Sequence, residues 1–488
     1  MTDVPSWVLS MTPLLMTLVF VTAAGACVGS LVNVLVYRLP RGEGVVFPSS
    51  RCPWCGKVLT WRENIPIFGW LFLRGRCRFC TAPISPEYPI VETVVAGLIG
   101  GVFALWFVVP ADAVLGLGTL RPEWAENGAS QTWPAFVVMA ILLGSLTAMT
   151  IIDARTFTIP LILTWVPAVV AVVFHTGHAV WQEAAHGAIE QTGTGFWTFA
   201  DGKVWESAPS GLWTLVTPMP GGWRMIGAAI GGTLGLGVSL VLLRTGLITR
   251  SFGDYEAWER AELERMEAEQ AGTESVAADA LETSTTPPPL TEIAGPSEPD
   301  AGLPDDPAMW IRYPHARREM IKELAFLAAP VGLAFAGSHA AVWLVTRFAG
   351  AWTFNPTTGG QDPPVDAPLW LTVLAGVLLG YLIGGGVVWA VRIGGSLLFG
   401  KEAMGLGDVH LMAAVGACVG WVDATLAFFA AAFVGLGYVL AGGIVLRRMP
   451  RAMPYGPFLA IATVLVVVGK VGVEALLGWL AGNPVSLP

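Results

Sequence analysis

The sequence predicts an all-α membrane protein that crosses the bilayer many times. Of its 488 residues, 54% are hydrophobic and only 13% are charged, whereas soluble proteins carry about 25% charged residues. Apolar runs recur along the whole chain, at lengths close to the roughly 20 residues that cross a bilayer as a helix. These observations predict about eight core membrane-spanning helices, plus about two more in an insertion.

The predicted spans follow one another along the chain. Nine of them cover residues 10–37, 88–109, 134–152, 159–176, 224–245, 323–347, 369–397, 424–446 and 456–481. A shorter apolar run, 409–421, is the tenth candidate. As a helix this run is only about 20 Å long, so it tilts, thins the bilayer or crosses incompletely.

Basic residues orient these spans. Eight Lys or Arg residues crowd the loop between Arg38 and Arg78, and loops rich in basic residues stay in the cytoplasm. Ten spans with both termini outside satisfy the remaining pattern of basic loops. Asp153, at the end of the third span, and Asp408, at the start of the short eighth segment, then lie at the same cytoplasmic face.

The spans define the expected domains. These are a first helix, a small zinc-ribbon-like cytoplasmic domain, helices carrying Asp153, an insertion with two extra spans and helices carrying Asp408, over residues 1–38, 39–86, 87–176, 177–368 and 369–488. Within the insertion, residues 251–310 hold fifteen acidic residues against two arginines. This acidic and proline-rich composition predicts a disordered cytoplasmic loop, with a short acidic helix over ERAELERMEAEQ.

Four of the six cysteines form two C-x-x-C pairs in the first cytoplasmic loop. They are Cys52, Cys55, Cys77 and Cys80, and two such pairs about 20 residues apart are typical of a tetrahedral Zn–S₄ site. Four protein ligands leave no open position for water, so the predicted zinc is structural. Two redox pairs, or thiols without a metal, are the alternative.

Two aspartates stand at apolar segments, in IIDARTFTIP (Asp153) and GLGDVHLM (Asp408). Taken alone, Asp153 can face water or pair with Arg155, and Asp408 can cap a helix that starts after it. Together, two carboxylates at one depth can share a proton and act as general base and general acid in peptide hydrolysis. Gly405 and Gly407 then let an extended substrate backbone approach. The pattern suggests an aspartyl protease without proving one.

Several segments resemble the bacterial type IV prepilin leader peptidase/N-methyltransferase family. GLGDVHLMAAVGACVGW, preceded by GKEAM, is similar to that family's G-x-G-D block, and IIDARTFTIP resembles the block of its first acid. GSLVNVLVYRLP, CPWC, WRENIPIFGWLFLRGRC and APISPEYPIVE resemble its cysteine-bearing domain in the same order, and RAMPYGPFLAIA its late P-[FY]-G-P-F segment. The resemblance covers roughly residues 10–176 and 369–481.

This resemblance implies a membrane aspartyl endopeptidase with Asp153 and Asp408 at the positions of the catalytic pair. Such an enzyme removes the basic leader of prepilins or pseudopilins, after a glycine, at the cytoplasmic face of the bacterial inner membrane. The resemblance also implies N-methylation of the new N-terminus from S-adenosylmethionine. The expected partners are the pilin precursors and the lipid bilayer, and no nucleic acid.

The chain departs from the family pattern at two positions, where His410 replaces a common Lys and Leu161 a common Asp or Asn. His410 either pairs with Asp408 or faces water. Glu92, just inside the second span, either lines a substrate or methyl-donor cleft or is solvated at the helix entry.

Other functions stay open. A transporter or channel with a zinc-stapled cytoplasmic domain would place its acids near the bilayer midplane, which the expected topology disfavours. A protein that only methylates, or an inactive scaffold, would not require both acids.

Overall fold

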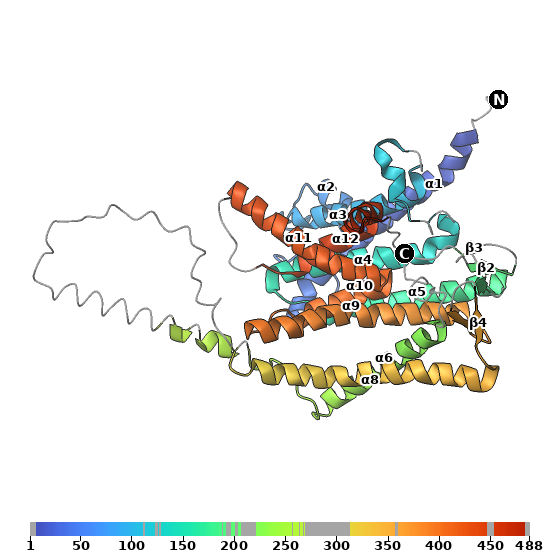
Figure 1. Cartoon of the computed structure of the whole chain (residues 1–488). Coiled ribbons are helices and arrows are strands. Elements are labelled where there is room, and N and C mark those ends of the chain that lie inside the picture. The colour runs from blue at the N-terminus through green and yellow to red at the C-terminus, as the bar shows by residue number, and fades with distance from the viewer. Residues whose placement is uncertain are drawn as a thin grey trace, which may run out of the picture. The chain divides into compact units, whose positions relative to one another are not determined.

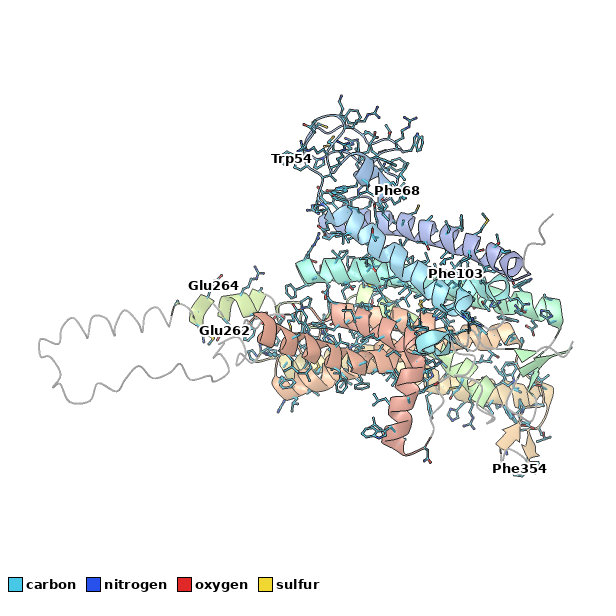
Figure 2. The ribbon with its side chains drawn as sticks, turned by 90° about the horizontal axis from the view of Figure 1, so that it is seen from above. Trp54, Phe68, Phe103, Glu262, Glu264 and Phe354 are labelled. Atoms are coloured by element: carbon cyan, nitrogen blue, oxygen red, sulfur yellow. The ribbon has the colours of Figure 1, made fainter. Side chains whose placement is uncertain are left out.

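A computed structural model gives the arrangement of the chain (Figure 1). It describes residues 6–483 apart from 111–112, 123–124, 126–127, 188, 192–196, 201–203, 206–220, 256, 263, 267, 269–312, 357–359 and 447–452. Most of the predicted acidic loop, from residue 269 to 310, therefore lies outside the described residues. The described residues at its beginning, 255, 257–262, 264–266 and 268, are helical as expected and include Glu262 and Glu264 (Figure 2).

The prediction of an all-α membrane protein is confirmed. Eight helices among the described residues are long and apolar enough to cross a membrane. They are α1 (Ser6–Arg38), α3 (Glu87–Phe103), which continues as η2 (Ala104–Val108), α4 (Ala129–Thr156), α5 (Leu161–His186), α6 (Gly221–Arg244), α8 (Ala316–Ala349), α9 (Leu369–Phe399) and α11 (Trp421–Leu446).

Two of the ten expected spans, 409–421 and 456–481, differ from the prediction. The apolar run 456–481 forms two helices, α12 (Gly456–Val468) and α13 (Lys470–Ala481), bent by 87° at Gly469. Glycine and the charged Lys470 interrupt the apolar run at this point, and both weaken a continuous membrane helix. The tenth candidate is the 14-residue helix α10 (Leu406–Val419), which begins earlier than residue 409.

The remaining described elements are short. Between the spans lie the helical turns η1 (Leu39–Arg41), α2 (Phe68–Phe72) and η3 (Val114–Leu120). Three short antiparallel strands follow α5, namely β1 (Ile189–Gln191), β2 (Trp197–Phe199) and β3 (Val204–Trp205). A two-stranded hairpin, β4 (Thr353–Asn355) and β5 (Gly360–Asp362), precedes α9.

The chain divides into two compact units. The first contains residues 1–236, 330–389 and 406–488, and the second contains residues 237–329 and 390–405. In the first unit, α4, α10, α11 and α12 run side by side (Figure 1), and α10 is buried along nearly its whole length. Asp408 stands in the first turn of this buried helix.

Small residues let the helices of the first unit approach closely, as in other membrane proteins. A methyl group on Gly29 of α1 would lie 2.6 Å from the Cα of Glu92 in α3. Gly380 of α9 and Gly416 of α10 are equally close, because a methyl group on either would overlap the backbone of the other. These contacts fix α1 against α3 and α10 against the first part of α9.

The second unit has its own aromatic core, built from Phe252, Tyr255, Tyr313, Ala316 and Met320. Beside it lies a fully buried arginine, Arg392. Its Nε donates to Glu323 at 2.8 Å and its Nη1 to Glu402 at 2.5 Å. Nη1 also donates to the Met404 carbonyl. The network therefore holds residues 402–404, which lead into the G-x-G-D segment.

Candidate active site and cysteine cluster

Asp153 is a buried acid in the last turn of α4. Only 6% of it is exposed, and its Oδ2 accepts a hydrogen bond from the backbone N–H of Gly456 at 3.0 Å. Gly456 is the first residue of α12, where backbone N–H groups lack a partner within the helix and carry partial positive charge. Asp153 therefore completes the N-terminus of a helix that lies 303 residues away in the chain.

The alternative partner of Asp153, Arg155, is engaged elsewhere. The guanidinium of Arg155 donates to the carboxylate of Glu87, the first residue of α3. This ion pair lies at the surface, since both side chains are about half exposed. Neither pairing with Arg155 nor exposure to water explains the buried carboxylate of Asp153.

Asp408 lies within α10 and does not precede it. The helix begins at Leu406, so the carboxylate belongs to the first turn, and the residue is 9% exposed. An acid in the first turn is favoured by the partial positive charge of the helix N-terminus. The prediction that Asp408 caps a helix starting at Val409 is wrong in register by three residues.

The surroundings of the two aspartates meet. Gly407, next to Asp408, lies against Ile159 in the loop that follows α4, and a methyl group on Gly407 would be 3.0 Å from the Ile159 Cβ. A second connection runs through Tyr455, which directly precedes Gly456, the residue whose N–H donates to Asp153. Burial, and then the negative charge of Asp408, raise the pKa of Tyr455. The structure thus brings the ends of α4, α10 and α12 together.

Sequence reasoning did not single out Gly456 or Tyr455. Both stand in RAMPYGPFLAIA, a segment noted only for its resemblance. The absence of a side chain at position 456 leaves room for the hydrogen bond to Asp153, because a methyl group there would lie 2.6 Å from Oδ2 of Asp153 and the carboxylate would have to move. A glycine and a proline opening an apolar run indicate a helix start, and that signal was available in the sequence.

Of the other predicted site residues, Gly405 and His410 lie close to Asp408 in the chain, whereas Glu92 lies in α3. Gly405 is exposed, just before α10, and His410 is half-buried within α10. Because residues two apart on a helix do not face each other, His410 and Asp408 point to different sides. Glu92 is buried in α3, and its Oε2 accepts the backbone N–H of Ile67 at 2.6 Å. Glu92 thus ties the cysteine-bearing loop to a spanning helix.

The four cysteines of the first loop gather into one cluster. Their Sγ atoms all lie within 4.8 Å of one another, and none forms a disulfide. The Sγ atoms of Cys52 and Cys80 are 3.8 Å apart. With Zn–S bonds near 2.3 Å, the edge of a tetrahedral Zn–S₄ site measures about 3.8 Å. The donor set and its spacing therefore fit a structural zinc ion.

The two halves of the cluster repeat one backbone fold. Cys52 N–H donates to the Lys57 carbonyl at 3.0 Å, and Cys77 N–H donates to the Ala82 carbonyl at 2.9 Å. The Phe79 N–H points at the Cys77 sulfur at 3.4 Å, and this hydrogen bond is the main cause that lowers the pKa of Cys77 to about 7.

Two family profiles match the segments just described. Residues 23–107 match the Bacterial Peptidase A24 N-terminal domain, which includes all four clustered cysteines and Glu92. Residues 322–440 match the Type IV leader peptidase family, including Gly405, Gly407 and Asp408. Two separate segments of the chain are thus similar to the type IV leader peptidase family.

Curated members of the leader peptidase family give the same result. The chain is 55% identical over 74 residues to a prepilin leader peptidase/N-methyltransferase of Myxococcus xanthus, covering 15% of this chain and 22% of that protein. It is 42% identical over 103 residues to the protein of that name from Klebsiella pneumoniae, covering 20% and 44%. With that from Pectobacterium carotovorum it shares 32% identity over 157 residues, covering 28% and 48%.

The chain thus matches less than half the length of each of these relatives. No solved structure matches the chain. The Type IV leader peptidase match begins at residue 322, within α8, so it extends into the predicted insertion and does not include Asp153.

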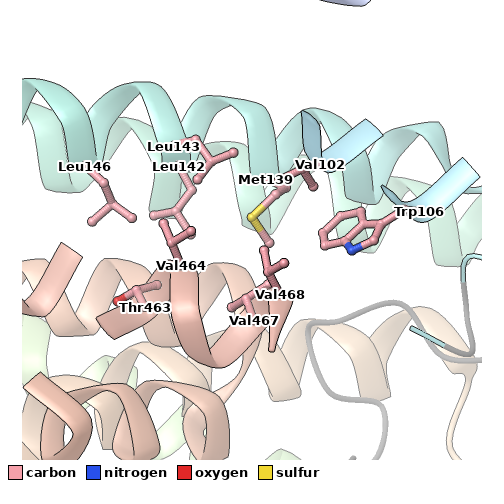
Figure 3. Close-up of a pocket in the computed structure, with 10 residues that line it drawn as sticks. All are labelled: Val102, Trp106, Met139, Leu142, Leu143, Leu146, Thr463, Val464, Val467 and Val468. Atoms are coloured by element: carbon pink, nitrogen blue, oxygen red, sulfur yellow. The ribbon is translucent and has the colours of Figure 1, made fainter. Parts of the chain in front are cut away.

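One small pocket among the described residues offers no evident place for a methyl donor. This pocket lies between α3, α4 and α12, and apolar side chains such as Val102, Met139 and Val467 line it (Figure 3). Thr463 supplies its one hydroxyl. S-adenosylmethionine carries a sulfonium, an amino group and a carboxylate, which an apolar lining does not satisfy. The pocket does not fit that cofactor.

Proposed function

We propose that this protein is a prepilin leader peptidase that uses Asp153 and Asp408 as its catalytic pair. The observation that carries the proposal is the meeting of the ends of α4, α10 and α12. Asp153 of α4 accepts a hydrogen bond from Gly456 of α12, and Gly407, next to Asp408 in α10, lies against Ile159 after α4. Both acids are buried there, although 255 residues separate them in the chain. Buried carboxylates are unfavourable in a membrane protein unless they have a partner or a task.

In the proposed reaction, Asp153 begins as the carboxylate and Asp408 as the protonated acid. The Gly456 N–H and the α12 N-terminus stabilise negative charge on Asp153. Asp153 takes a proton from water as the water oxygen bonds to the scissile carbonyl carbon, and Asp408 donates its proton to the carbonyl oxygen. The C–N bond then breaks, the amine receives the proton held by Asp153, and Asp408 regains its own.

Gly405 and Gly407 belong to the proposed substrate contact. Gly405 is exposed and directly precedes α10, so a peptide in extended conformation can approach its backbone closely. We assign the site to the cytoplasmic face of the bacterial inner membrane, because the loops near both aspartates carry the basic residues of the chain.

Two cofactors complete the proposal. A structural zinc ion would stabilise the fold of the first loop without taking part in hydrolysis. Its ligands would be Cys52, Cys55, Cys77 and Cys80. N-methylation of the processed pilin from S-adenosylmethionine is proposed on the printed name of the relatives alone, and we assign no residue to the methyl donor.

Leader removal in cells that co-express a prepilin tests the catalytic pair. Asp153→Asn and Asp408→Asn should each lower the rate of leader removal by about 10²–10⁴-fold, because each removes a group that transfers a proton. Asp423→Asn is the matched control. Asp423 is a buried aspartate at the start of α11 with no proposed role, so this variant should process the prepilin normally.

The outcome separates the proposal from its alternatives. Full-rate leader removal by either variant would show that the pair is not catalytic. A transporter or channel would remove no leader in any variant, including the unchanged protein.

A further inference from the structure

The short helix α2 exposes one apolar face. Phe68, Leu71 and Phe72 are 56%, 52% and 78% exposed, and residues at spacing i, i+3 and i+4 share one side of a helix. The other side faces the cysteine-bearing loop. There Gly69 is buried, and the indole N–H of Trp70 donates to the Ile84 carbonyl at 3.0 Å. An exposed apolar face on a helix so firmly held requires a partner for that face.

A hydrogen bond fixes the depth of α2 along the spanning helices. The backbone N–H of Ile67, directly before α2, donates to Glu92 at 2.6 Å. Glu92 lies five residues into α3, which is about 7.5 Å along the helix axis from Glu87. Ile67 adopts a φ of 63°, a conformation that β-branched residues rarely take. Ile67 is thus both the residue that donates to Glu92 and the centre of a tight turn, in which the Phe68 N–H donates to the Pro66 carbonyl at 2.6 Å.

Figure 2 shows the same placement. The part of the chain that carries Trp54 and Phe68 projects sideways from α1 and α3, beside the helices and not beyond their ends along the helix axes. The segment thus lies within the length of α1 and α3 along their axes.

The residues that follow α2 are basic. Arg74, Arg76 and Arg78 are all exposed, and residues 39–86 contain seven Lys or Arg residues against two Glu. One of these acids, Glu63, is paired with Arg78 at 3.1 Å. An apolar helix face followed by arginines is typical of segments that lie in the interface of a membrane with anionic lipids.

We propose that α2 lies in the cytoplasmic leaflet, with Phe68, Leu71 and Phe72 among the acyl chains and Arg74 and Arg76 at anionic phospholipid headgroups. The leaflet rests on the orientation given in the proposed function, whereas contact with lipid does not depend on catalysis. The same arginines disfavour a basic prepilin leader as the occupant of this face, because like charges repel.

Photo-crosslinking from α2 tests the proposal in the full-length protein. Phe72→benzoylphenylalanine is reconstituted in nanodiscs of phosphatidylglycerol and phosphatidylethanolamine, irradiated and analysed by mass spectrometry. We expect phospholipid adducts at a yield within about threefold of that from Phe20→benzoylphenylalanine, since Phe20 is 74% exposed on the spanning helix α1. Glu264→benzoylphenylalanine, at an exposed acidic position, should give at least tenfold less.

Two further arms separate the explanations. Replacing phosphatidylglycerol by phosphatidylcholine should reduce the Phe72 adduct several-fold, and Arg74→Gln with Arg76→Gln should remove most of this dependence. The proposal is overturned if Phe72 crosslinks to an added prepilin or to a second copy of the chain, or gives no lipid adduct while Phe20 does. Zinc content confirms that each variant is folded. An Asp153→Asn background should leave every yield unchanged, so a failure of the catalytic assignment is seen separately.

Discussion

At the scale of single residues, an atom added at Gly456 would act directly on Asp153, one of the two proposed catalytic acids. A methyl group there would lie 2.6 Å from Oδ2 and 3.2 Å from Cγ of Asp153, so the carboxylate must move. Small displacements of catalytic groups reduce turnover by as much as about 100-fold. We expect Gly456→Ala to lower kcat at least tenfold with KM changed less than threefold, measured on a purified prepilin.

Gly435→Ala is the control for this variant. A methyl group on Gly435 of α11 would meet the Phe458 ring of α12 at 3.6 Å or more, which is an ordinary contact. Its kcat should stay within twofold of the unchanged protein. Equal losses in both variants would mean that general helix packing, and not the position of Asp153, explains the effect.

The sequence predicted the two aspartates as a pair but not their partners. Their local motifs and the positive-inside pattern were sufficient to propose that they lie at one face. The bond from Gly456 to Asp153 joins residues 303 positions apart, and only the packing of α12 against α4 creates it. The pairing of Arg155 with Glu87 likewise depends on where α3 begins.

At the scale of elements, the cysteine cluster depends on the metal that we propose for it. Purified protein should contain about one zinc per chain, and Cys52→Ser with Cys55→Ser should abolish zinc binding, measured by elemental mass spectrometry. Structural zinc supplies several kcal/mol or more of folding free energy. The melting temperature of the double variant should therefore fall by several degrees.

Two cysteines outside the cluster serve as controls. Cys27 is exposed and Cys418 is buried far along the chain, and neither belongs to the cluster. Cys27→Ser and Cys418→Ala should each retain the full zinc content. A zinc content that is unchanged in the Cys52/Cys55 variant would refute the assignment.

The Arg392 network stabilises the second unit as a whole. Arg392 is fully buried between Glu323 and Glu402, and removing one member of a buried ion pair costs roughly 3–5 kcal/mol. We therefore expect Arg392→Met to lower the melting temperature, measured in detergent, by several degrees or more. Arg265→Met breaks an exposed pair with Glu262 and should change it little, because such pairs contribute about 0–1 kcal/mol.

A loss of similar size in both arginine variants would contradict this interpretation. Arg392→Met with Glu323→Leu and Glu402→Leu provides a further check. Replacing every charge of a buried network together avoids an unpaired buried ion. This triple variant should recover part of the stability that Arg392→Met loses.

Sequence periodicity predicted the long spans well and the last helices less well. Apolar runs of 20 or more residues leave few alternatives to a spanning helix. The run 456–481 has the same length, but Gly469 and Lys470 allow a bend of 87°. Composition averaged over a window does not detect a bend, because the packing of α12 against α4 and α11 decides where the helix ends.

At the scale of the whole molecule, the orientation of the spans can be measured directly. An alkaline phosphatase domain fused after Gly187, at the end of α5, should be active because that end is expected outside. The same domain fused after Gly246, at the end of α6, should be inactive. The reverse pattern would invert the proposed orientation and move both aspartates to the outer face.

The similarity to the leader peptidases and the general architecture followed from sequence, because several motifs occur in the same order as in that family. The two-unit division did not follow. The second unit combines the ends of α6, α8 and α9 with residues 251–268 and 400–405, and no composition change marks these limits. The buried Arg392 in an apolar segment was the available signal, since such a charge requires acidic partners.

The lengths of the two short helices beside the aspartates bear on how the proposed peptidase would reach a pilin precursor. α10 and α12 have 14 and 13 residues, about 20 Å each, against roughly 30 Å of hydrocarbon. Each helix is therefore too short to cross the hydrocarbon by itself. Under the proposed function, a precursor anchored by its own apolar helix would then be cleaved at the end of that helix while it remains in the bilayer.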